Sequence, residues 1–252
     1  MVDERAPIID CRAENLRLAL QRRGAYAVSG FSKPVDFGRY FTDGLIDGVR
    51  MRMESLGELD VPTGNVVACD PFYVMEDFTC PFERRIAPGR YPVLAALADL
   101  DSWGHRVAFA MLRLSTTAPA GWQLATTTFP NQGHVFRSHY GVEAGLGLFA
   151  DLSAAELFAR VQTELAAAQP RGNYYDDVLA DCFERHPNWC DHRPDPTSSL
   201  NAIIFSTGLG DGVYASYWGL ASGGEPVCLV TDFQLFDREG VILQAAGPRP
   251  QT

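Results

Sequence analysis

Four residues with metal-binding side chains fall close together near the end of the chain: Cys182, His186, Cys190 and His192. If Tyr175–His186 is a helix, Cys182 and His186 share one face, and the following loop can return the other two residues to it. Two thiolates and two imidazoles suit tetrahedral zinc. The spacing Cys-x3-His-x3-Cys-x-His matches no common zinc motif. Two interpretations therefore stand, a zinc site and a polar loop.

A second set of candidates consists of acids at predicted strand ends and glycine turns: Asp70, Glu143, Asp151, Asp211 and Asp232. Paired carboxylates act as general acid and base or bind a hard cation, and His139 is a candidate base. Acids beside glycine are also common turn residues, since their side chains hydrogen-bond the local backbone, and we expect this role for Asp211 taken alone. Asp232 interrupts an apolar run, so its carboxylate must be hydrogen-bonded, paired or exposed.

Aromatic residues near the glycine turns are candidates for binding. They are Tyr91, Trp122, Tyr140, Tyr214, Tyr217 and Trp218, with Asp70 as a polar member of the same set. Exposed aromatic side chains often anchor binding surfaces. Core packing is the alternative role for most of them, above all for Trp122 and Trp218. The sequence contains no Gly-x-Ser-x-Gly elbow, Walker loop, dinucleotide-binding glycine motif or His-Glu-x-x-His motif.

A predicted sheet must position these residues, and its clearest part is the C-terminal stretch. Three runs rich in β-branched and aromatic residues, Ala202–Ser206, Val213–Trp218 and Val227–Phe236, are separated by glycines and predict a strand meander. Earlier runs, Val66–Cys69 and Tyr91–Leu100, follow turns that contain proline and glycine. We expect all these strands to form one continuous sheet, with the acidic and aromatic candidates on one side.

Helices are few in the predicted fold. Ser153 and Glu156 form a capping box ahead of an apolar stripe at helical spacing. Shorter helices are expected over residues 12–23 and, despite two glycines, over Phe37–Arg50. Between Arg50 and the capping box, an alternating apolar run changes parity near Met111–Leu112, which indicates a bulge or a strand buried on both faces. The predicted fold class is α+β, a large and mostly antiparallel sheet or sandwich with a few packed helices.

The sequence also suggests a domain organisation, and its charge suggests a class of partner. Residues 1–52 are interpreted as an N-terminal helical extension and residues 53–247 as a β-rich domain. The net charge of −10 argues against nucleic acid as partner. Solubility is the preferred interpretation of this charge, and the alternative is that it steers a basic protein partner. No apolar run approaches the roughly 20 residues of a membrane span, and the N-terminus lacks the apolar region of a secretory signal. We therefore expect a cytoplasmic protein without membrane contact, in which a disulfide framework of the six cysteines is the less favoured interpretation.

Five motifs in order resemble those of the DUF4241 family of bacterial proteins: LGELDVPTGNVVACDP, APGRYPV, YGVEAGLGLFAD, STGLGDGVYASYWGL and VTDF. The resemblance runs from about Leu56 to Phe236. It carries over the positions Asp70, Pro88, Gly89, Tyr91, Pro92, Gly141, Gly145, Asp151, Gly208, Asp211, Gly212, Tyr214, Trp218, Gly219 and Asp232. The chain departs from the family motif at Glu143, where aspartate is usual, and this weakens a strict metal or catalytic role there.

The resemblance brings no assigned activity, and it implies an immunity-type protein that neutralises a toxin. Together with the acidity, it leads us to expect a cytosolic acidic protein-binding module with a basic protein partner. The alternative is a small-molecule hydrolase or lyase-like enzyme. It would use Asp211 and Asp232, with Glu143 or Asp151, in a ligand pocket lined by Tyr214 and Trp218. That alternative requires the carboxylates to lie about 5–9 Å apart around a cleft.

Overall fold

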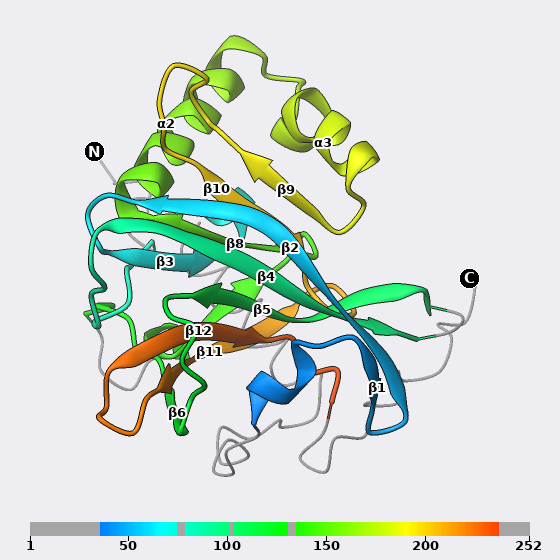
Figure 1. Ribbon diagram of the computed structural model, residues 1–252. Coiled ribbons are helices and arrows are strands. Elements are labelled where there is room, and N and C mark those ends of the chain that lie inside the picture. The colour runs from blue at the N-terminus through cyan, green and yellow to red at the C-terminus, as the bar shows by residue number, and fades with distance from the viewer. Residues whose placement is uncertain (1–35, 75–78, 101–102, 131–134, 237–252) are drawn as a thin grey trace. The chain divides into compact units, whose positions relative to one another are not determined.

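The computed structural model describes residues 36–74, 79–100, 103–130 and 135–236, all within one compact unit, Val35–Thr252 (Figure 1). Two antiparallel sheets and two α-helices build this unit, so the fold is α+β and mostly β. Among the described residues, no helix has the length and apolar character needed to cross a bilayer. The helix expected over residues 12–23 lies outside the described residues.

The larger sheet, sheet A, has eight strands. Seven follow one another in the order β1-β2-β4-β5-β12-β11-β6, and β7 also pairs with β11. All the pairings are antiparallel. The strands are β1 Gly44–Ile46, β2 Val49–Val61, β4 Gly89–Asp99, β5 His105–Arg113, β6 Gly121–Leu124, β7 His139–Val142, β11 Gly212–Leu220 and β12 Pro226–Asp232.

The smaller sheet, sheet B, has four strands in the order β3-β8-β10-β9, also antiparallel. They are β3 Val66–Cys69, β8 Leu146–Asp151, β10 Ala202–Ser206 and β9 Trp189–His192. Strands β8 and β10 are buried on both faces, which explains their nearly continuous apolar sequences. Phe149 and Phe205 point into the core shared with sheet A, whereas Leu148 and Ile204 pack beneath the helices.

The helices cover the other face of sheet B, as Figure 1 shows. Helix α2 (Leu152–Ala168) packs Ala154, Ala155 and Phe158 against it. A π-helical turn, η6 (Tyr175–Leu179), leads into the short helix α3 (Ala180–Arg185). Three 3-10 turns complete the described elements: η2 Phe37–Tyr40, η3 Pro71–Tyr73 and η5 Val135–Arg137.

The expectation of one continuous sheet is wrong. Strand β10 belongs to sheet B, whereas β11 and β12 belong to sheet A, so the chain changes sheets between Ser206 and Gly212. The crossing is tight because Gly208 has a φ of 49° and its backbone nitrogen donates to the carbonyl oxygen of Val107. The three C-terminal strands therefore do not form a meander, and their side chains do not share one face.

The helix expected over Phe37–Arg50 is also wrong. Only η2 is helical there, and β1 and the start of β2 form a hairpin whose glycines, Gly44 and Gly48, both have positive φ values. An L-residue rarely adopts such angles, and a helix never requires them. Strand β2 continues through residue 52, the position at which the sequence analysis ends the N-terminal extension.

Two finer predictions need adjustment. The N-cap of α2 is Asp151 rather than Ser153, because the Asp151 side chain accepts the hydrogen bond from the Ser153 backbone nitrogen. Strand β5 is buried on both faces, as one alternative proposed. Its register shift lies at Ala108, between the pairs Ala96–Phe109 and Leu97–Val107, rather than near Met111–Leu112.

Candidate functional site

The four residues of the zinc hypothesis do not form one ligand set. Cys182 and Cys190 are joined in a disulfide with their Cα atoms 5.6 Å apart. His192 Nε2 lies 2.8 Å from the hydroxyl of Tyr174, and His186 stacks on the ring of Trp189. Within the described ranges, no group of three or more His, Cys, Asp or Glu side chains is placed to hold a metal ion.

The expectation against disulfides is wrong for the pair Cys182 and Cys190. Strand β9 returns alongside α3, and this return sets the two Cα atoms at a spacing that a disulfide spans. The other described cysteines, Cys69, Cys80 and Cys228, are free. Burial raises the pKa of all three thiols, that of Cys228 to about 12.

Three of the candidate acids converge on the turn between β7 and β8. Oδ2 of Asp70 accepts hydrogen bonds from the backbone nitrogens of Glu143 (2.9 Å) and Ala144 (3.2 Å). Oδ1 of Asp211 accepts from the backbone nitrogen of Gly145 (3.0 Å). Glu143 itself is exposed and accepts a hydrogen bond from the hydroxyl of Tyr73. Asp70 and Asp211 therefore hold this turn from distant parts of the chain, whereas the turn role expected for Asp211 was a hydrogen bond to its own local backbone.

The other two acids lie on separate elements. Asp151 is fully buried at the start of α2, where Oδ1 accepts from Ser153 and Oδ2 accepts from the backbone nitrogen and hydroxyl of Thr63. Asp232 ends β12 and accepts a hydrogen bond from the backbone nitrogen of Gln234. Burial raises the pKa of Asp232 to about 7. Each of the five candidate acids thus has its own hydrogen-bond partner.

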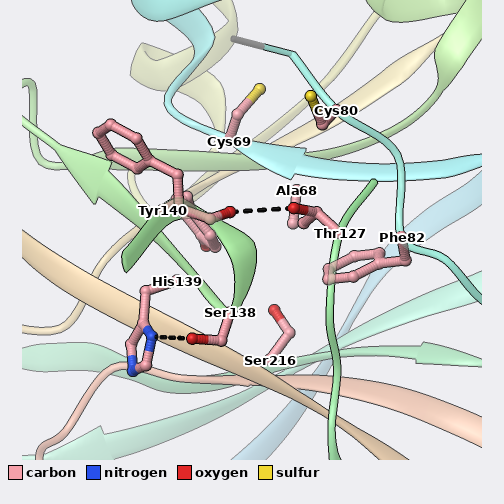
Figure 2. A pocket seen from close by; sticks show the side chains of 10 residues that line it. Ala68, Cys69, Cys80, Phe82, Thr127, Ser138, His139, Tyr140 and Ser216 are labelled. Carbon is pink, nitrogen blue, oxygen red and sulfur yellow. Dashed lines mark hydrogen bonds between the residues drawn. The ribbon is translucent and has the colours of Figure 1, made fainter. Parts of the chain in front are cut away.

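A small cavity lies beside β3, β7 and β11 (Figure 2). Its volume of about 40 Å³ is room for a few water molecules and far less than the several hundred Å³ of a typical small-molecule site. Ser138 and His139 line it, and the Ser138 hydroxyl lies 2.7 Å from His139 Nδ1. None of the five candidate acids is among the described residues that line it.

His139 is neutral at physiological pH, because burial lowers its pKa to about 4. A neutral imidazole can accept a proton, so the residue keeps the character of a base that the sequence analysis assigned to it. The described residues that line the cavity include no carboxylate that could act as its acid–base partner. The cavity therefore combines an imidazole with hydroxyl and thiol groups, and it lacks the carboxylate partner of the proposed hydrolase.

The aromatic candidates are mainly packing residues. Trp218 and Tyr214 are buried between the sheets, where Trp218 contacts Phe82 edge-on and the Tyr214 hydroxyl donates to the carbonyl of Gly210. Tyr140 lies in the same core and lines the cavity, and Tyr91 is half-buried at its border. The remaining two, Trp122 and Tyr217, pack against Phe37 of η2, on the other face of sheet A.

A surface patch that the sequence analysis missed lies where η3 meets η6. The ring of Phe72 contacts the ring of Tyr175 (6.4 Å between centroids), although the two residues are about 100 positions apart. We call this surface the acid-rimmed patch. It consists of Phe72, Tyr73, Tyr175 and Val178, with the exposed acids Glu143, Asp176, Asp177 and Asp181 on the same elements or bonded to them.

The patch combines apolar exposure with negative charge. Tyr73, Tyr175 and Val178 expose 36%, 39% and 39% of their surface and are among the exposed large hydrophobic side chains of the described residues. A second ring, Phe183 of α3, stacks under Tyr175 (5.7 Å) and holds it in place. A sequence signal existed in the run YYDDV, which sets aromatic and acidic residues side by side. What that run alone does not show is which of its rings face solvent.

A comparison with family models identifies the chain's relatives. The model of DUF4241, described as a protein of unknown function, matches residues 59–231. The chain belongs to the DUF4241 family. No curated protein and no solved structure matches it.

The DUF4241 match places every candidate acid except Asp232 inside the family region, which ends one residue before it. Both elements of the acid-rimmed patch, η3 and η6–α3, also fall inside it. The turn η2 and strand β1 precede the matched region. In this DUF4241 protein, the loop-fastening carboxylates and the patch therefore belong to the family domain.

Proposed function

We propose that this DUF4241 protein is a protein-binding module that holds a basic segment of a partner protein at the acid-rimmed patch. The observation that carries the proposal is the contact between Phe72 and Tyr175, because it brings exposed aromatic side chains from two distant segments onto one acidic surface. A toxin-neutralising role of the immunity type, which the family resemblance implies, is the specific form of this function to test first.

The apolar part of the patch supplies anchors for a partner. Exposed tyrosines bury large areas on binding at a low cost in side-chain entropy, and they are frequent hot spots of interfaces. Tyr175 is supported from below by Phe183, and the hydroxyl of Tyr73 is held by Glu143. Because both rings are already positioned, a partner loses little of its binding energy to ordering them.

The charge of the patch determines the kind of partner. Between Tyr174 and His186 the chain carries four acids and one arginine, and all four acids are exposed. Such a surface attracts cationic side chains and accelerates their association, an effect that salt screens. Arginine is the best-matched group, since it can pair with carboxylates and stack on tyrosine at the same time.

The hydrolase alternative has less support. The carboxylates of Asp211, Asp232 and Asp151 accept hydrogen bonds from backbone N–H groups of separate segments, and that of Glu143 accepts one from the hydroxyl of Tyr73. None of the four is among the described residues lining the cavity. Asp232 has the raised pKa that a catalytic acid needs, but it lies at the end of β12 rather than beside the other acids of the proposal.

The test compares two charge-reversal variants with the same change in net charge. Asp177→Lys/Asp181→Lys alters the patch, whereas Glu156→Lys/Glu164→Lys alters exposed acids of α2. The probe is a fluorescent arginine-rich peptide, titrated at about 0.05 M and about 0.5 M NaCl. We expect the patch variant to lose about tenfold or more in affinity and the α2 variant to stay close to wild type.

A hydrophobic variant pair completes the test. Tyr175→Ala removes an anchor of the patch, and Trp103→Ala removes a similarly exposed ring before β5. Only the first should weaken binding of the arginine-rich peptide. Equal losses from both charge reversals would mean that the peptide senses net charge alone. That result, or absence of wild-type binding at low salt, would overturn the proposal.

A further inference from the structure

The helical segment that carries Tyr175 and Val178 is tied to strand β9 at two points. At its start, the hydroxyl of Tyr174 lies 2.8 Å from Nε2 of His192. Further along, Cys182 of α3 is bonded to Cys190 of β9. Among the described strands, β9 pairs only with β10 and forms an edge of sheet B. The disulfide therefore adds a covalent link between the patch-bearing segment and the sheet, beside the backbone of residues 186–188.

The segment depends on such attachments. Helix α3 has six residues, and the preceding η6 is π-helical, so neither is stable without tertiary contacts. Leu179 and Phe183 provide apolar contacts with the core beneath the helices. Phe183 directly follows Cys182 in sequence and stacks under the Tyr175 ring. The position of the main anchor of the acid-rimmed patch is thus linked to the disulfide through one side chain.

We propose that Cys182 and Cys190 are a thiol–disulfide exchange site that controls the acid-rimmed patch. The disulfide form holds α3 on β9 and presents Tyr175, whereas the dithiol form lets the segment separate from β9 and lose the patch. This inference rests on the proposed function for its consequence in binding. Its structural part, the release of the segment, stands independently.

The exchange requires a dithiol reductant of the kind that acts on protein disulfides. A thiolate of the reductant attacks Sγ of Cys182, which is half-buried, whereas Cys190 is 1% exposed. The Cys182–Cys190 bond breaks, and Cys190 leaves as a thiolate and takes up a proton. The second thiol of the reductant then attacks the mixed disulfide. Cys182 is released as a thiol, and the reductant becomes a disulfide, so two electrons pass to the protein.

The main experiment measures amide hydrogen exchange by mass spectrometry on the full-length protein, before and after reduction with dithiothreitol. We expect exchange in Tyr175–Arg185 to rise about tenfold or more on reduction, whereas α2 keeps its protection. The variant Cys182→Ser/Cys190→Ser should show the amide exchange of the reduced protein, and dithiothreitol should not change it. Cys80→Ser, which changes a free thiol at the cavity, should respond as wild type does.

The same samples are then titrated with the arginine-rich peptide. Reduction should weaken binding by about tenfold, and re-oxidation with glutathione disulfide should restore it. Unchanged exchange in Tyr175–Arg185 after reduction would overturn the inference, as would failure of glutathione disulfide to bond the two cysteines. If exchange rises but the oxidised protein does not bind the peptide, the proposed function fails and the release of the segment is retained.

Discussion

The carboxylate of Asp70 lies 2.9 Å from the backbone nitrogen of Glu143, a residue 73 positions further along the chain. Asp70 is 1% exposed and also accepts hydrogen bonds from the backbone nitrogens of Ala144 and Phe72. One side chain therefore joins the end of β3 to the turn between β7 and β8. Burial nevertheless raises the pKa of Asp70, because the cost of desolvation exceeds the benefit of its three donors.

Replacing Asp70 with alanine should destabilise the protein strongly. The change leaves three backbone N–H groups without their acceptor, and a fully buried donor that loses its partner costs about 1–3 kcal/mol. Because Glu143 and Ala144 are exposed residues, we expect a total loss of about 2–3 kcal/mol in the free energy of unfolding, measured by urea denaturation. Asp211→Ala is the matched control, since its exposed carboxylate accepts one hydrogen bond from the same turn. A loss for Asp70→Ala no larger than the control's would contradict this role.

Asp151→Ala should destabilise the protein, because it removes the hydrogen bonds that join the turn after β2 to the start of α2. Its carboxylate accepts from Ser153 at the helix N-terminus and from Thr63 on the preceding turn. Loss of an N-cap alone costs about 1 kcal/mol, and loss of the Thr63 bonds adds to it, so we expect about 2–3 kcal/mol. Thermal unfolding followed by circular dichroism measures the change. Ser153→Ala keeps the cap and should cost less, and a reversed order would count against Asp151 as the cap.

Alanine substitutions at two glycines can distinguish the cost of a strained backbone angle from the cost of a steric clash. Gly64 and Gly224 both have positive φ, 76° and 90°, but a Cβ on Gly64 would meet the carbonyl oxygen of Ile86, whereas one on Gly224 meets nothing within 4 Å. Alanine at Gly224 should therefore cost about 1 kcal/mol, and alanine at Gly64 should cost this amount plus about 1–3 kcal/mol. Urea denaturation of the two variants tests the difference, and equal losses would contradict it.

Asp232 should give the protein a pH dependence opposite to that of most acids. Burial raises its pKa in the folded protein to about 7, well above the value of about 3.9 in an unfolded chain. Between these pKa values the folded state binds a proton that the unfolded state does not, so this contribution to stability is complete below about pH 4. It falls as the pH rises and is lost above about pH 7.

The variant Asp232→Asn isolates this contribution. Asparagine keeps an acceptor for the backbone nitrogen of Gln234 and has no charge to bury. Relative to wild type, the variant should gain stability as the pH rises from about 4 to about 7, by at most about 1.4 kcal/mol per pH unit, and then stay level. Urea denaturation at several pH values measures the difference, and a difference that does not vary with pH would refute the raised pKa.

Two histidines should make the protein sensitive to acid. Burial lowers the pKa of His139 and of His192 to about 4, below the value of about 6.5 in an unfolded chain. The contribution of these two neutral histidines to the free energy of unfolding is therefore complete above about pH 6.5 and is lost as the pH falls toward 4. His192→Gln should reduce the loss between these pH values, as measured by thermal unfolding, while leaving stability at pH 8 less affected. A variant with the wild-type slope would contradict the role of His192.

Local patterns predicted the strands and the main helix well. Val66–Cys69 and Ala202–Ser206 are strands with the predicted bounds, and the capping sequence predicted α2 to within two residues of its start. These successes reflect short-range information: glycine and proline turns, β-branched runs and helical periodicity. The family resemblance from Leu56 to Phe236 is likewise confirmed by the match over residues 59–231.

The errors arose where distant segments decide the outcome. Nothing in the glycine-rich segment between β10 and β11 indicates that it passes from one sheet to the other, since a hairpin turn uses the same residues. The spacing of Cys182 and Cys190 suited zinc ligands as well as a disulfide. The acid-rimmed patch escaped notice because Phe72 and Tyr175 meet only in the folded chain. Of the candidate acids, Asp70, Asp151 and Asp211 hold turns through hydrogen bonds to distant residues.

The turn η2 has a practical consequence for work with shorter forms of the protein. Phe37 covers Trp122 and Tyr217, and Tyr40 covers Phe109, all on the outward face of sheet A. A fragment that starts at residue 53 would present these rings to water and lose β1 with part of β2, and so it should precipitate on expression. A fragment that starts at residue 36 keeps the cover, and is the shorter form we would choose for crystals.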